Sequence, residues 1–370
     1  MKRLLRKANG FLLRKYPQFG LNLRISLFLQ KGMKETDYNG KIFREDLEEQ
    51  YSKYLSDEER TDKKYLEWLT KDIIKCYLLY KITPDEYFMH DLRHKEDSYK
   101  ASILGFAMKD TLCIEACGAH FKEYYSQLKN KWKFYKIAKP YFKRQVCRIH
   151  EEGDFSEFER FCQTNSRFIV KPNDSCSGKG IHLVDLEKTE YNGARELFEH
   201  YLMQKGDWII EELIVQDEAM AQWHRDSVNT VRVPSIMTKN GPQIILPLFR
   251  TGKGGNLVDN CHNDGGLMAV PDAKTGVVIT DGYDIYTHVV ERHPDSGLKF
   301  KGWQIPRWGE LLQTVAEIHS KCLPHQKYIG FDMALTPKGW VVIEGNWGNM
   351  PHQVCVGYGI RKEFEKLMKS

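Results

Sequence analysis

The sequence predicts an α+β protein in which a mostly helical N-terminal region precedes a body rich in antiparallel sheet. Between residues 51 and 80, apolar side chains recur every three or four residues among many charges, a spacing typical of helices. Two turn sequences, Asn240-Gly241 and Thr336-Pro337-Lys338-Gly339, each separate a pair of β-type runs and predict hairpins. With 370 residues, 41% of them hydrophobic, the chain is long enough for two or three domains with a sizeable core.

The first 125 residues are expected to be mostly helical, and they contain no recognisable chemical motif. Ser56 and Glu59 have the spacing of a capping box, which predicts the start of a helix. Pro84 opens a further segment, and a basic helix is expected from Asn130 to Ala138.

From Arg167 onwards, short strands, turns and helices alternate. Helical periodicity returns in Trp308–Cys322. The expected strands are Phe168–Lys171, Trp208–Val215, Thr230–Thr238, Gln243–Thr251, Tyr328–Leu335 and Trp340–Asn346.

Positive charge is concentrated in residues 1–36, which hold nine Lys or Arg against one acid, Glu35. The whole chain carries a net charge of +5, so the remainder is slightly negative, and a nucleic-acid-binding body is not expected. Leucines and phenylalanines alternate with these cations. The segment is therefore either a helical cap with one face buried, which is the commoner use of such a pattern, or a surface that docks on an anionic membrane.

Composition excludes several other classes of protein. No apolar run approaches the 18 residues of a membrane-spanning helix, and Arg6, Lys7, Arg14 and Lys15 interrupt the apolar region that a signal peptide needs. Nine scattered cysteines without a C-x-x-C pair favour reduced thiols in the cytoplasm and argue against structural zinc.

A Gly/Ser-rich loop, Asp174–Gly180, follows the expected strand that carries Lys171. Small residues let backbone N–H groups approach phosphate closely, and Lys171 and Lys179 add positive charge. The loop is not a Walker A motif, because Asn173 and Gly180 stand where Gly and Ser or Thr are required. On these residues alone it is either a phosphate-binding loop or an ordinary hairpin loop with two solvated lysines.

The C-terminal hairpin carries three oxygen ligands. Glu344 and Asn346 share a face because side chains alternate along a strand, and the short turn brings Asp332 roughly opposite them. Two carboxylates and a carboxamide form a hard-oxygen set suited to Mg²⁺ on nucleotide phosphates. The alternative is a solvated sheet face on which Asn346 begins a turn.

The apolar strand that begins at Trp208 ends in the acidic pair Glu211-Glu212. Such a strand can offer backbone hydrogen bonds and an apolar wall to adenine. Glu218, a turn later, could accept hydrogen bonds from the ribose hydroxyls. A strand that runs into an acidic loop is also common without a ligand.

The order of these motifs resembles the ATP-grasp superfamily, and most closely the sugar-transfer-associated ATP-grasp proteins of bacterial polysaccharide clusters. A lysine strand, a Gly-rich loop, a Glu-Glu hinge, an arginine strand and an Asp…Glu-x-Asn ribbon follow one another along the chain. Further motifs that carry the resemblance are Ser227–Arg232, Gly254–Asn260, Gly265-Gly266, Thr275-Gly276, Gly330–Asp332 and Glu344–Asn346.

The resemblance implies an ATP-grasp fold, in which two α+β lobes clasp ATP. The small lobe would be residues 126–215 and the large lobe 216–370, after the helical region 1–125. Lys131 and Lys171 would contact phosphate, and Arg232 would face the γ-phosphate. The other implied nucleotide contacts are Ser175, Ser177, Gly178, Lys179, Gly180, Glu211, Glu212, Leu213, Ile214 and Glu218.

Two further sets of residues have implied roles. Asp332, Glu344 and Asn346 would hold Mg²⁺. The acceptor side would be lined by Arg250, Asn256, Asp259 and Asn260.

The implied activity is that of an ATP-dependent carboxylate–amine ligase with ATP and Mg²⁺ as cofactors. A carboxylated sugar or cell-surface glycan precursor would form an acyl-phosphate, from which an amine would displace phosphate to give an amide. Two alternatives stay open: a kinase on the same scaffold, and a non-catalytic nucleotide-binding scaffold in polysaccharide assembly. A cytoplasmic location is expected, with residues 1–36 contacting the inner face of the cell membrane.

Overall fold

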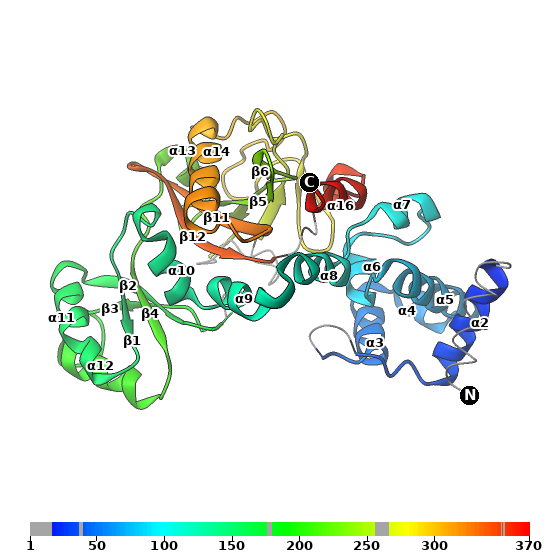
Figure 1. The fold of residues 1–370 in the computed structure, drawn as a ribbon, viewed down its shortest axis with the longest axis horizontal. Coiled ribbons are helices and arrows are strands. Elements are labelled where there is room, and N and C mark those ends of the chain that lie inside the picture. The colour runs from blue at the N-terminus through cyan, green and yellow to red at the C-terminus, as the bar shows by residue number, and fades with distance from the viewer. Residues whose placement is uncertain (1–16, 37–39, 176–179, 256–265, 349, 351) are drawn as a thin grey trace. The chain divides into compact units, whose positions relative to one another are not determined.

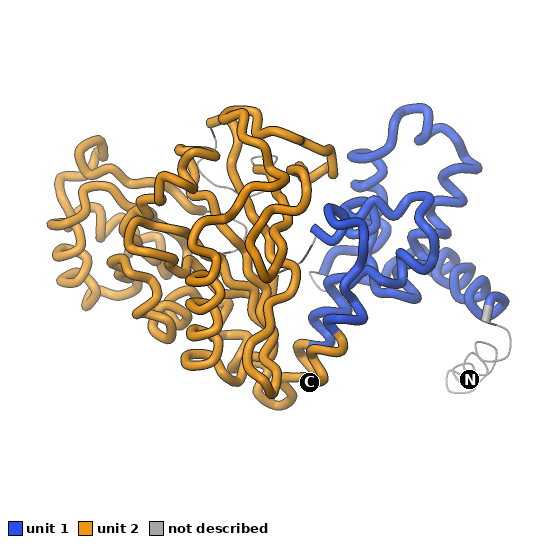
Figure 2. The backbone as a smooth tube through the Cα atoms, turned by 90° about the horizontal axis from the view of Figure 1, so that it is seen from above, with its two compact units in different colours: residues 1–112, 349–364 blue, residues 113–348, 365–370 orange. Residues whose placement is uncertain are grey.

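The computed structural model of the chain describes residues 17–36, 40–175, 180–255, 266–348, 350 and 352–370 (Figure 1). The chain divides into two compact units (Figure 2). Unit 1 comprises residues 1–112 and 349–364, and unit 2 comprises residues 113–348 and 365–370. The lobe boundaries expected at residues 125 and 215 stay predictions.

Unit 1 is helical, as predicted for the N-terminal region. Its helices are α2 (Pro17–Gln30), α3 (Phe43–Tyr54), α4 (Asp57–Thr61), α5 (Lys63–Tyr80), α6 (Pro84–Met89), α7 (Asp97–Ser102) and α15 (Gln353–Val356). Leu69, Ile73 and Cys76 of α5 are fully buried at helical spacing and form the centre of its core. Two further helices, α8 (Phe106–Cys117) and α16 (Arg361–Met368), begin in unit 1 and end in unit 2.

Capping residues divide the helical pattern of residues 51–80 into separate helices. The predicted box begins α4: Glu59 N donates to Ser56 Oγ (3.2 Å), and Ser56 N donates to Glu59 Oε2 (2.8 Å). Asp62 ends α4 and begins α5, because its side chain accepts hydrogen bonds from Lys64 N and Tyr65 N. None of the helices in the described ranges combines the length and apolar character needed to cross a bilayer.

Unit 2 begins with helices that lead into a small antiparallel sheet. The helices are α9 (Phe121–Lys129) and α10 (Lys131–Ala138), with 3₁₀ turns at Gly118–His120 and Lys139–Tyr141. The strands are β1 (Val146–Ile149), β2 (Arg167–Pro172), β3 (His182–Asp185) and β4 (Trp208–Glu212), in the spatial order β1-β4-β2-β3. A 3₁₀ turn at Glu152–Asp154 precedes α11 (Phe155–Thr164), which packs with α12 (Ala194–Met203) against one face through Phe158, Phe161, Leu197 and Phe198.

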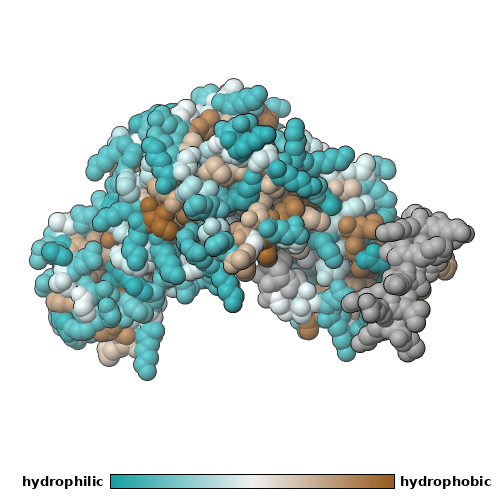
Figure 3. Space-filling model, viewed as in Figure 1, coloured by the Kyte–Doolittle hydropathy of each residue, from teal (hydrophilic) through white to brown (hydrophobic). Residues whose placement is uncertain are grey.

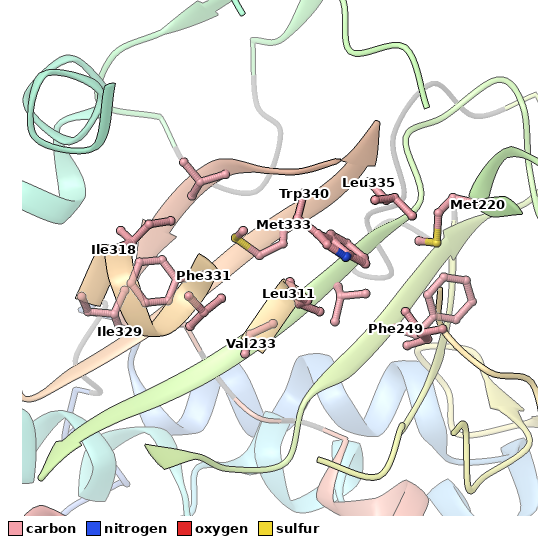
Figure 4. Packing of buried hydrophobic residues seen from close by; sticks show 14 of the residues in the cluster. Met220, Val233, Phe249, Leu311, Ile318, Ile329, Phe331, Met333, Leu335 and Trp340 are labelled. Carbon is pink, nitrogen blue, oxygen red and sulfur yellow. The ribbon is translucent and has the colours of Figure 1, made fainter. Parts of the chain in front are cut away.

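A larger antiparallel sheet follows in the order β10-β9-β8-β7-β5-β11-β12, with β6 also paired to β5. Its strands are β5 (Thr230–Thr238), β6 (Gly241–Ile244), β7 (Leu248–Gly252), β8 (Gly266–Ala269), β9 (Gly282–Tyr283), β10 (Val289–Val290), β11 (Tyr328–Thr336) and β12 (Gly339–Asn346). The short helix α13 (Glu218–Ala221) precedes it, and α14 (Trp308–Glu317) continues as a π-helix over Ile318–Cys322. Leu311 and Ile318 from these helices pack on Val233, Phe331 and other side chains of the sheet (Figure 4).

Two expected strands differ from those observed. The run Gln243–Thr251 is interrupted at Leu246, which has a φ of +44°, so it forms two strands that pair with different parts of β5. The run Trp208–Val215 ends as a strand at Glu212. Both hairpins predicted from their turn sequences are present, as β5–β6 and β11–β12.

Candidate nucleotide site

The β11–β12 hairpin brings its acidic residues together. Asp332 pairs directly with Glu344, and Gly330 pairs with Asn346. The register shifts between Asp332 and Met333, because Met333 already faces Val342. This bulge lies beside the acidic pair, at the kind of position where bulges redirect side chains.

Two arginines from neighbouring strands bind Asp332. Arg232 on β5 faces Asp332 across the sheet, and its Nε and Nη2 donate to the two carboxylate oxygens at 2.6 and 2.8 Å. Arg250 on β7 approaches the same carboxylate with Nη2 2.9 Å from Oδ1, and its Nε donates to Thr230 Oγ1 (3.0 Å). The buried Asp332 carboxylate is therefore fixed by two positive charges.

Asn346 links Arg232 to the second carboxyl group. Its Oδ1 accepts from Arg232 Nη1 (3.2 Å) and Gly348 N (2.7 Å), and its Nδ2 donates to Glu344 Oε1 (3.1 Å). A Cβ atom at Gly348 would lie 2.0 Å from Arg232 Nη1, so any larger residue here would displace the Arg232 guanidinium from Asn346.

The environment separates the pKa values of the two carboxyl groups. Burial favours the neutral acid at Asp332, but the charges of Arg232 and Arg250 prevail and lower its pKa below the usual value. Burial and the adjacent Asp332 charge raise the pKa of Glu344. The hairpin thus holds one carboxylate and one carboxyl that resists ionisation.

Lys171 lies in a buried ion-pair network within the small sheet. Its Nζ is 2.5 Å from Glu211 Oε1, and Arg144 Nη2 is 2.8 Å from Glu211 Oε2. Burial alone would raise the pKa of Glu211, but Arg144 and Lys171 lower it to about 2. Both oxygens of the Glu211 carboxylate are therefore paired with these cations. If Glu211 binds adenine, it would do so through its backbone N–H and C=O groups.

Arg144 also joins this network to the large sheet. Its Nη1 donates to Val342 O on β12 (2.8 Å), while its Nε and Nη2 donate to Glu211 on β4 at 3.2 and 2.8 Å. The guanidinium carbon lies 4.6 Å from the centre of the Phe142 ring.

Asn173 organises the start of α10. Asn173 Oδ1 accepts from Trp132 N (2.9 Å), and its Nδ2 donates to Asp207 Oδ2 (2.6 Å). Lys131, the first residue of the helix, donates from Nζ to the backbone oxygens of Ser175 and of Asn173, the latter at 3.4 Å. Lys131 therefore lies beside the glycine-rich loop.

Cations from both sheets act on one carboxyl group. Besides Arg232, the charges of Lys171 on β2 and Lys131 on α10 favour the ionised form of Glu344 on β12. Direct contacts thus join five residues of the large sheet, Arg232, Arg250, Asp332, Glu344 and Asn346. Lys131 and Lys171 act on this group through their charge.

The remaining predicted nucleotide contacts are less closely grouped. Glu212 Oε2 accepts from Gln145 N (2.8 Å), and Leu213 and Ile214 follow the end of β4 and are half-buried. Glu218 is exposed and forms an ion pair with Arg225 at 2.8 Å.

The glycine-rich loop and the predicted acceptor residues are described only in part. Ser175 Oγ donates to Pro172 O (3.2 Å), and Gly180 has a φ of +75°. Six of the predicted site residues lie outside the described residues: Ser177, Gly178, Lys179, Asn256, Asp259 and Asn260.

Two residues of the site have no motif that would identify them. Arg144 follows Lys143 in a basic stretch, and Asn173 occupies a loop position noted only as a departure from the Walker A pattern. Both are buried or nearly so, and both act between elements that are distant in sequence. Their positions therefore depend on tertiary structure that local spacing does not determine.

The hairpin offers donors of the kind that Mg²⁺ prefers, but Asp332 and Asn346 Oδ1 are bound by Arg232, Arg250 and Gly348 N, so part of these contacts would have to open for the ion to bind. Two carboxyl groups and a carboxamide are hard oxygen ligands, and Mg²⁺ usually binds through one or two carboxylates while phosphates and waters complete its shell. Within the described ranges, no group of three or more His, Cys, Asp or Glu side chains is arranged to hold a metal. Asn346 would therefore have to be the third protein ligand.

Comparison with known proteins gives one family match. Residues 120–369 match the family described as sugar-transfer associated ATP-grasp. A search of curated proteins found no significant match.

Several solved structures show a distant similarity. The ATP-grasp ligase PsnB complexed with minimal precursor is 11% identical, with a TM-score of 0.40 over 67% of this chain and 62% of that one. D-alanyl-alanine synthetase A from Vibrio cholerae is 12% identical, with a TM-score of 0.41 over 66% and 65%. L-amino acid ligase from Bacillus licheniformis is 14% identical, with a TM-score of 0.35 over 60% and 40%. The chain thus spans from 40% to 65% of the length of these proteins.

Proposed function

The chain belongs to the sugar-transfer-associated ATP-grasp family, and from this premise we propose that it is an ATP-dependent carboxylate–amine ligase. The family and its α+β fold are those that the motifs predicted. The observation that carries the proposal is that Arg232 binds Asp332 at 2.6 Å, while the charges of Lys171 and Lys131 act on the neighbouring Glu344. Such a site can neutralise a polyphosphate and position its terminal group.

Lys131 and Lys171 are proposed to bind the phosphates of ATP. Both ammonium groups have protein partners: Lys171 pairs with the Glu211 carboxylate, and Lys131 donates hydrogen bonds to backbone carbonyls. Phosphate oxygens would become additional partners, with Ser175–Gly180 as the loop that covers them. Leu213 and Ile214 would line the adenine pocket, and Glu218 would accept the ribose hydroxyls after separating from Arg225.

Asp332, Glu344 and Asn346 are proposed to hold Mg²⁺. When bound, this ion neutralises charge on the transferred phosphoryl group. Arg232 already contacts Asp332 and Asn346, so it is placed to face the same phosphoryl group. Arg250, Asn256, Asp259 and Asn260 would line the acceptor side.

The proposed reaction needs no covalent protein nucleophile. A substrate carboxylate oxygen attacks the γ-phosphorus, the bond to the β-phosphate oxygen breaks, and ADP leaves. The amine nitrogen then attacks the acyl carbon, phosphate leaves, and the amine loses a proton to solvent. The protein contributes positioning and charge neutralisation. We propose a carboxylated sugar or glycan precursor as the acyl donor, in keeping with the description of the family.

The direct test is a matrix of uronic acids and amino acids assayed for ADP and phosphate release with ATP and Mg²⁺. Ligation predicts that phosphate appears only when a carboxylate and an amine are both present. Glu344→Gln should lower turnover by at least about a hundredfold. Glu291→Gln, which alters an exposed carboxylate paired with Lys299, should retain turnover and serves as the matched control.

Two results would overturn the proposal. A phosphorylated product formed without any amine would identify a kinase. Unchanged turnover and Mg²⁺ dependence in Glu344→Gln would show that the metal assignment is wrong.

A further inference from the structure

Helix α2 has apolar side chains on two of its faces. Leu21, Ile25 and Phe28 are buried in the core of unit 1, where the Phe28 ring lies 5.0 Å from that of Phe43 and 5.7 Å from that of Tyr77. This face is the helical cap expected from the sequence, and it accounts for the attachment of α2 to its unit.

A second apolar row remains exposed on the same helix. Phe19, Leu23 and Leu27 are 60%, 36% and 39% exposed. They recur every four residues, so they form a continuous row along one side of the helix. Most of the surface visible in Figure 3 is hydrophilic, with hydrophobic residues in small patches. A continuous row of three large apolar side chains on one helix is therefore a candidate docking surface.

Cations without acidic partners accompany this row. Arg24, Lys31 and Lys34 make no ion pair with any described residue, and Glu35 is the one acid between residues 17 and 36. Elsewhere in unit 1 the cations are commonly neutralised: Lys71 by Glu67, Lys75 by Asp97 and Lys100 by Asp72. Arg24 on α2, and Lys31 and Lys34 directly after its C-terminal end, are thus available to an external anionic partner.

We propose that the exposed face of α2 docks on an anionic lipid bilayer. Helices that lie in the membrane interface place apolar side chains among the acyl chains and nearby cations at the headgroups. Here the exposed apolar row accompanies Arg24 within α2, and Lys31 and Lys34 follow the helix. Residues 17–36 hold three cations and one acid, and this net positive charge favours an anionic bilayer over a second copy of the same helix. The inference is independent of the proposed ligase reaction.

The test is sedimentation of the full chain with two kinds of vesicle, phosphatidylcholine alone and an equal mixture with phosphatidylglycerol. Binding is expected to the anionic vesicles and to weaken with added salt. The triple variant Phe19→Ser, Leu23→Ser and Leu27→Ser should lower the partition coefficient by at least about tenfold. Arg24→Gln, Lys31→Gln and Lys34→Gln together should lower it to a similar extent and reduce its salt dependence.

A matched control removes equally exposed apolar groups elsewhere. Met203→Ser, Ile279→Ser and Val289→Ser, at positions that are 75%, 43% and 61% exposed, should bind vesicles like the unaltered chain. Retained helical circular dichroism would show that the α2 variants are folded.

Three results would overturn the assignment. Equal binding to neutral and anionic vesicles would remove the electrostatic basis. A dimer that the triple serine variant converts to a monomer would identify a second copy as the occupant. The third result is that the triple serine variant binds vesicles as well as the unaltered chain while deletion of residues 1–16 abolishes binding. That result would show that residues 1–16, and not α2, form the membrane-binding surface.

Discussion

At the scale of single residues, Arg144 is the residue whose loss should most clearly affect the site. Glu211 is buried and fully ionised near neutral pH because Arg144 and Lys171 share its charge. Arg144→Met would leave Glu211 with one cation and Val342 O without its donor. We expect the KM for ATP to rise about tenfold and the free energy of unfolding to fall by about 3 kcal/mol.

Steady-state kinetics and denaturant unfolding check this prediction together. Arg144→Lys keeps the charge but not the forked geometry, so it should restore most of the stability and only part of the KM. Arg195→Met is the control, because Arg195 forms ion pairs with Glu152 and Glu199, neither of which is a residue of the site. If both variants raised the KM equally, Arg144 would have no special positioning role.

Glu86 in unit 1 predicts a pH dependence of stability. It is buried and accepts hydrogen bonds from Thr83 N (3.1 Å), Thr83 Oγ1 (2.9 Å) and Phe106 N (2.5 Å). Burial, with a contribution from the Asp85 charge, raises its pKa from 4.5 to about 7. The folded state thus keeps a proton that the unfolded state releases, so stability present below pH 4.5 is lost as the pH rises through 7.

Glu86→Gln cannot ionise and should escape this loss. Its stability relative to the unaltered chain should increase by up to about 3 kcal/mol between pH 4.5 and 7. Trp68 is the single tryptophan in the sequence of unit 1, so fluorine NMR of fluorotryptophan during denaturant unfolding reports on that unit. Glu67→Gln, at an exposed ion pair, is the control. Parallel pH profiles for Glu86→Gln and the unaltered chain would contradict the prediction.

At the scale of elements, the packing of α10 on β12 sets Lys131 near the acidic hairpin. Gly345 lies between Glu344 and Asn346, and a Cβ atom there would be 2.6 Å from Cε2 of Phe134 on α10. Gly345→Ala should therefore push the helix and strand apart, lowering the unfolding free energy by about 1–3 kcal/mol and reducing turnover.

The Gly345→Ala prediction has an internal control in Phe134. Phe134→Leu makes room for the added methyl group, so the double variant should be more stable than the sum of the single effects predicts. Denaturant unfolding and ATP turnover of all four proteins give the coupling energy. Additive effects would mean that Gly345 does not require the Phe134 contact.

The sequence predicted elements well where the signals were local. The Ser56–Glu59 box, the basic helix expected from Asn130 to Ala138 and the two hairpins depend on residues a few positions apart. The interruption at Leu246 and the bulge after Asp332 were not predicted, because strand pairing sets them and hydrophobic alternation does not reveal it. The opposition of Asp332 and Glu344 was predicted, since a short turn fixes the register.

At the scale of the whole molecule, the sequence did not predict which distant segments share a unit. The expected helical region ended at residue 125, but unit 1 also contains residues 349–364. Likewise, the predicted lysines and acids could be assigned from motifs, whereas the Arg144 contacts to β4 and β12 could not. Tertiary pairing between residues far apart in sequence leaves no periodic signal in one chain.

Gln353 is the residue that ties the returning segment to unit 1. It is fully buried, its Oε1 accepts from Leu104 N (3.0 Å) and Ile360 N (3.1 Å), and its Nε2 donates to Leu104 O and Met350 O, both at 3.1 Å. Gln353→Leu keeps the volume but leaves these backbone groups without partners. We expect unit 1 to lose about 2–4 kcal/mol of stability.

The readout is again the fluorotryptophan resonance of Trp68, compared with the seven tryptophans whose sequence positions fall in unit 2. In Gln353→Leu the Trp68 transition should move to lower denaturant while the unit 2 transitions stay in place, because the lost hydrogen bonds all lie within unit 1. Gln18→Leu, at an exposed residue of α2 whose amide is 3.4 Å from Asn22 Oδ1, should change stability by less than about 0.5 kcal/mol. A common shift of all eight resonances would show that the two units unfold as one, and an unmoved Trp68 transition would show that the returning segment contributes nothing to the helical unit.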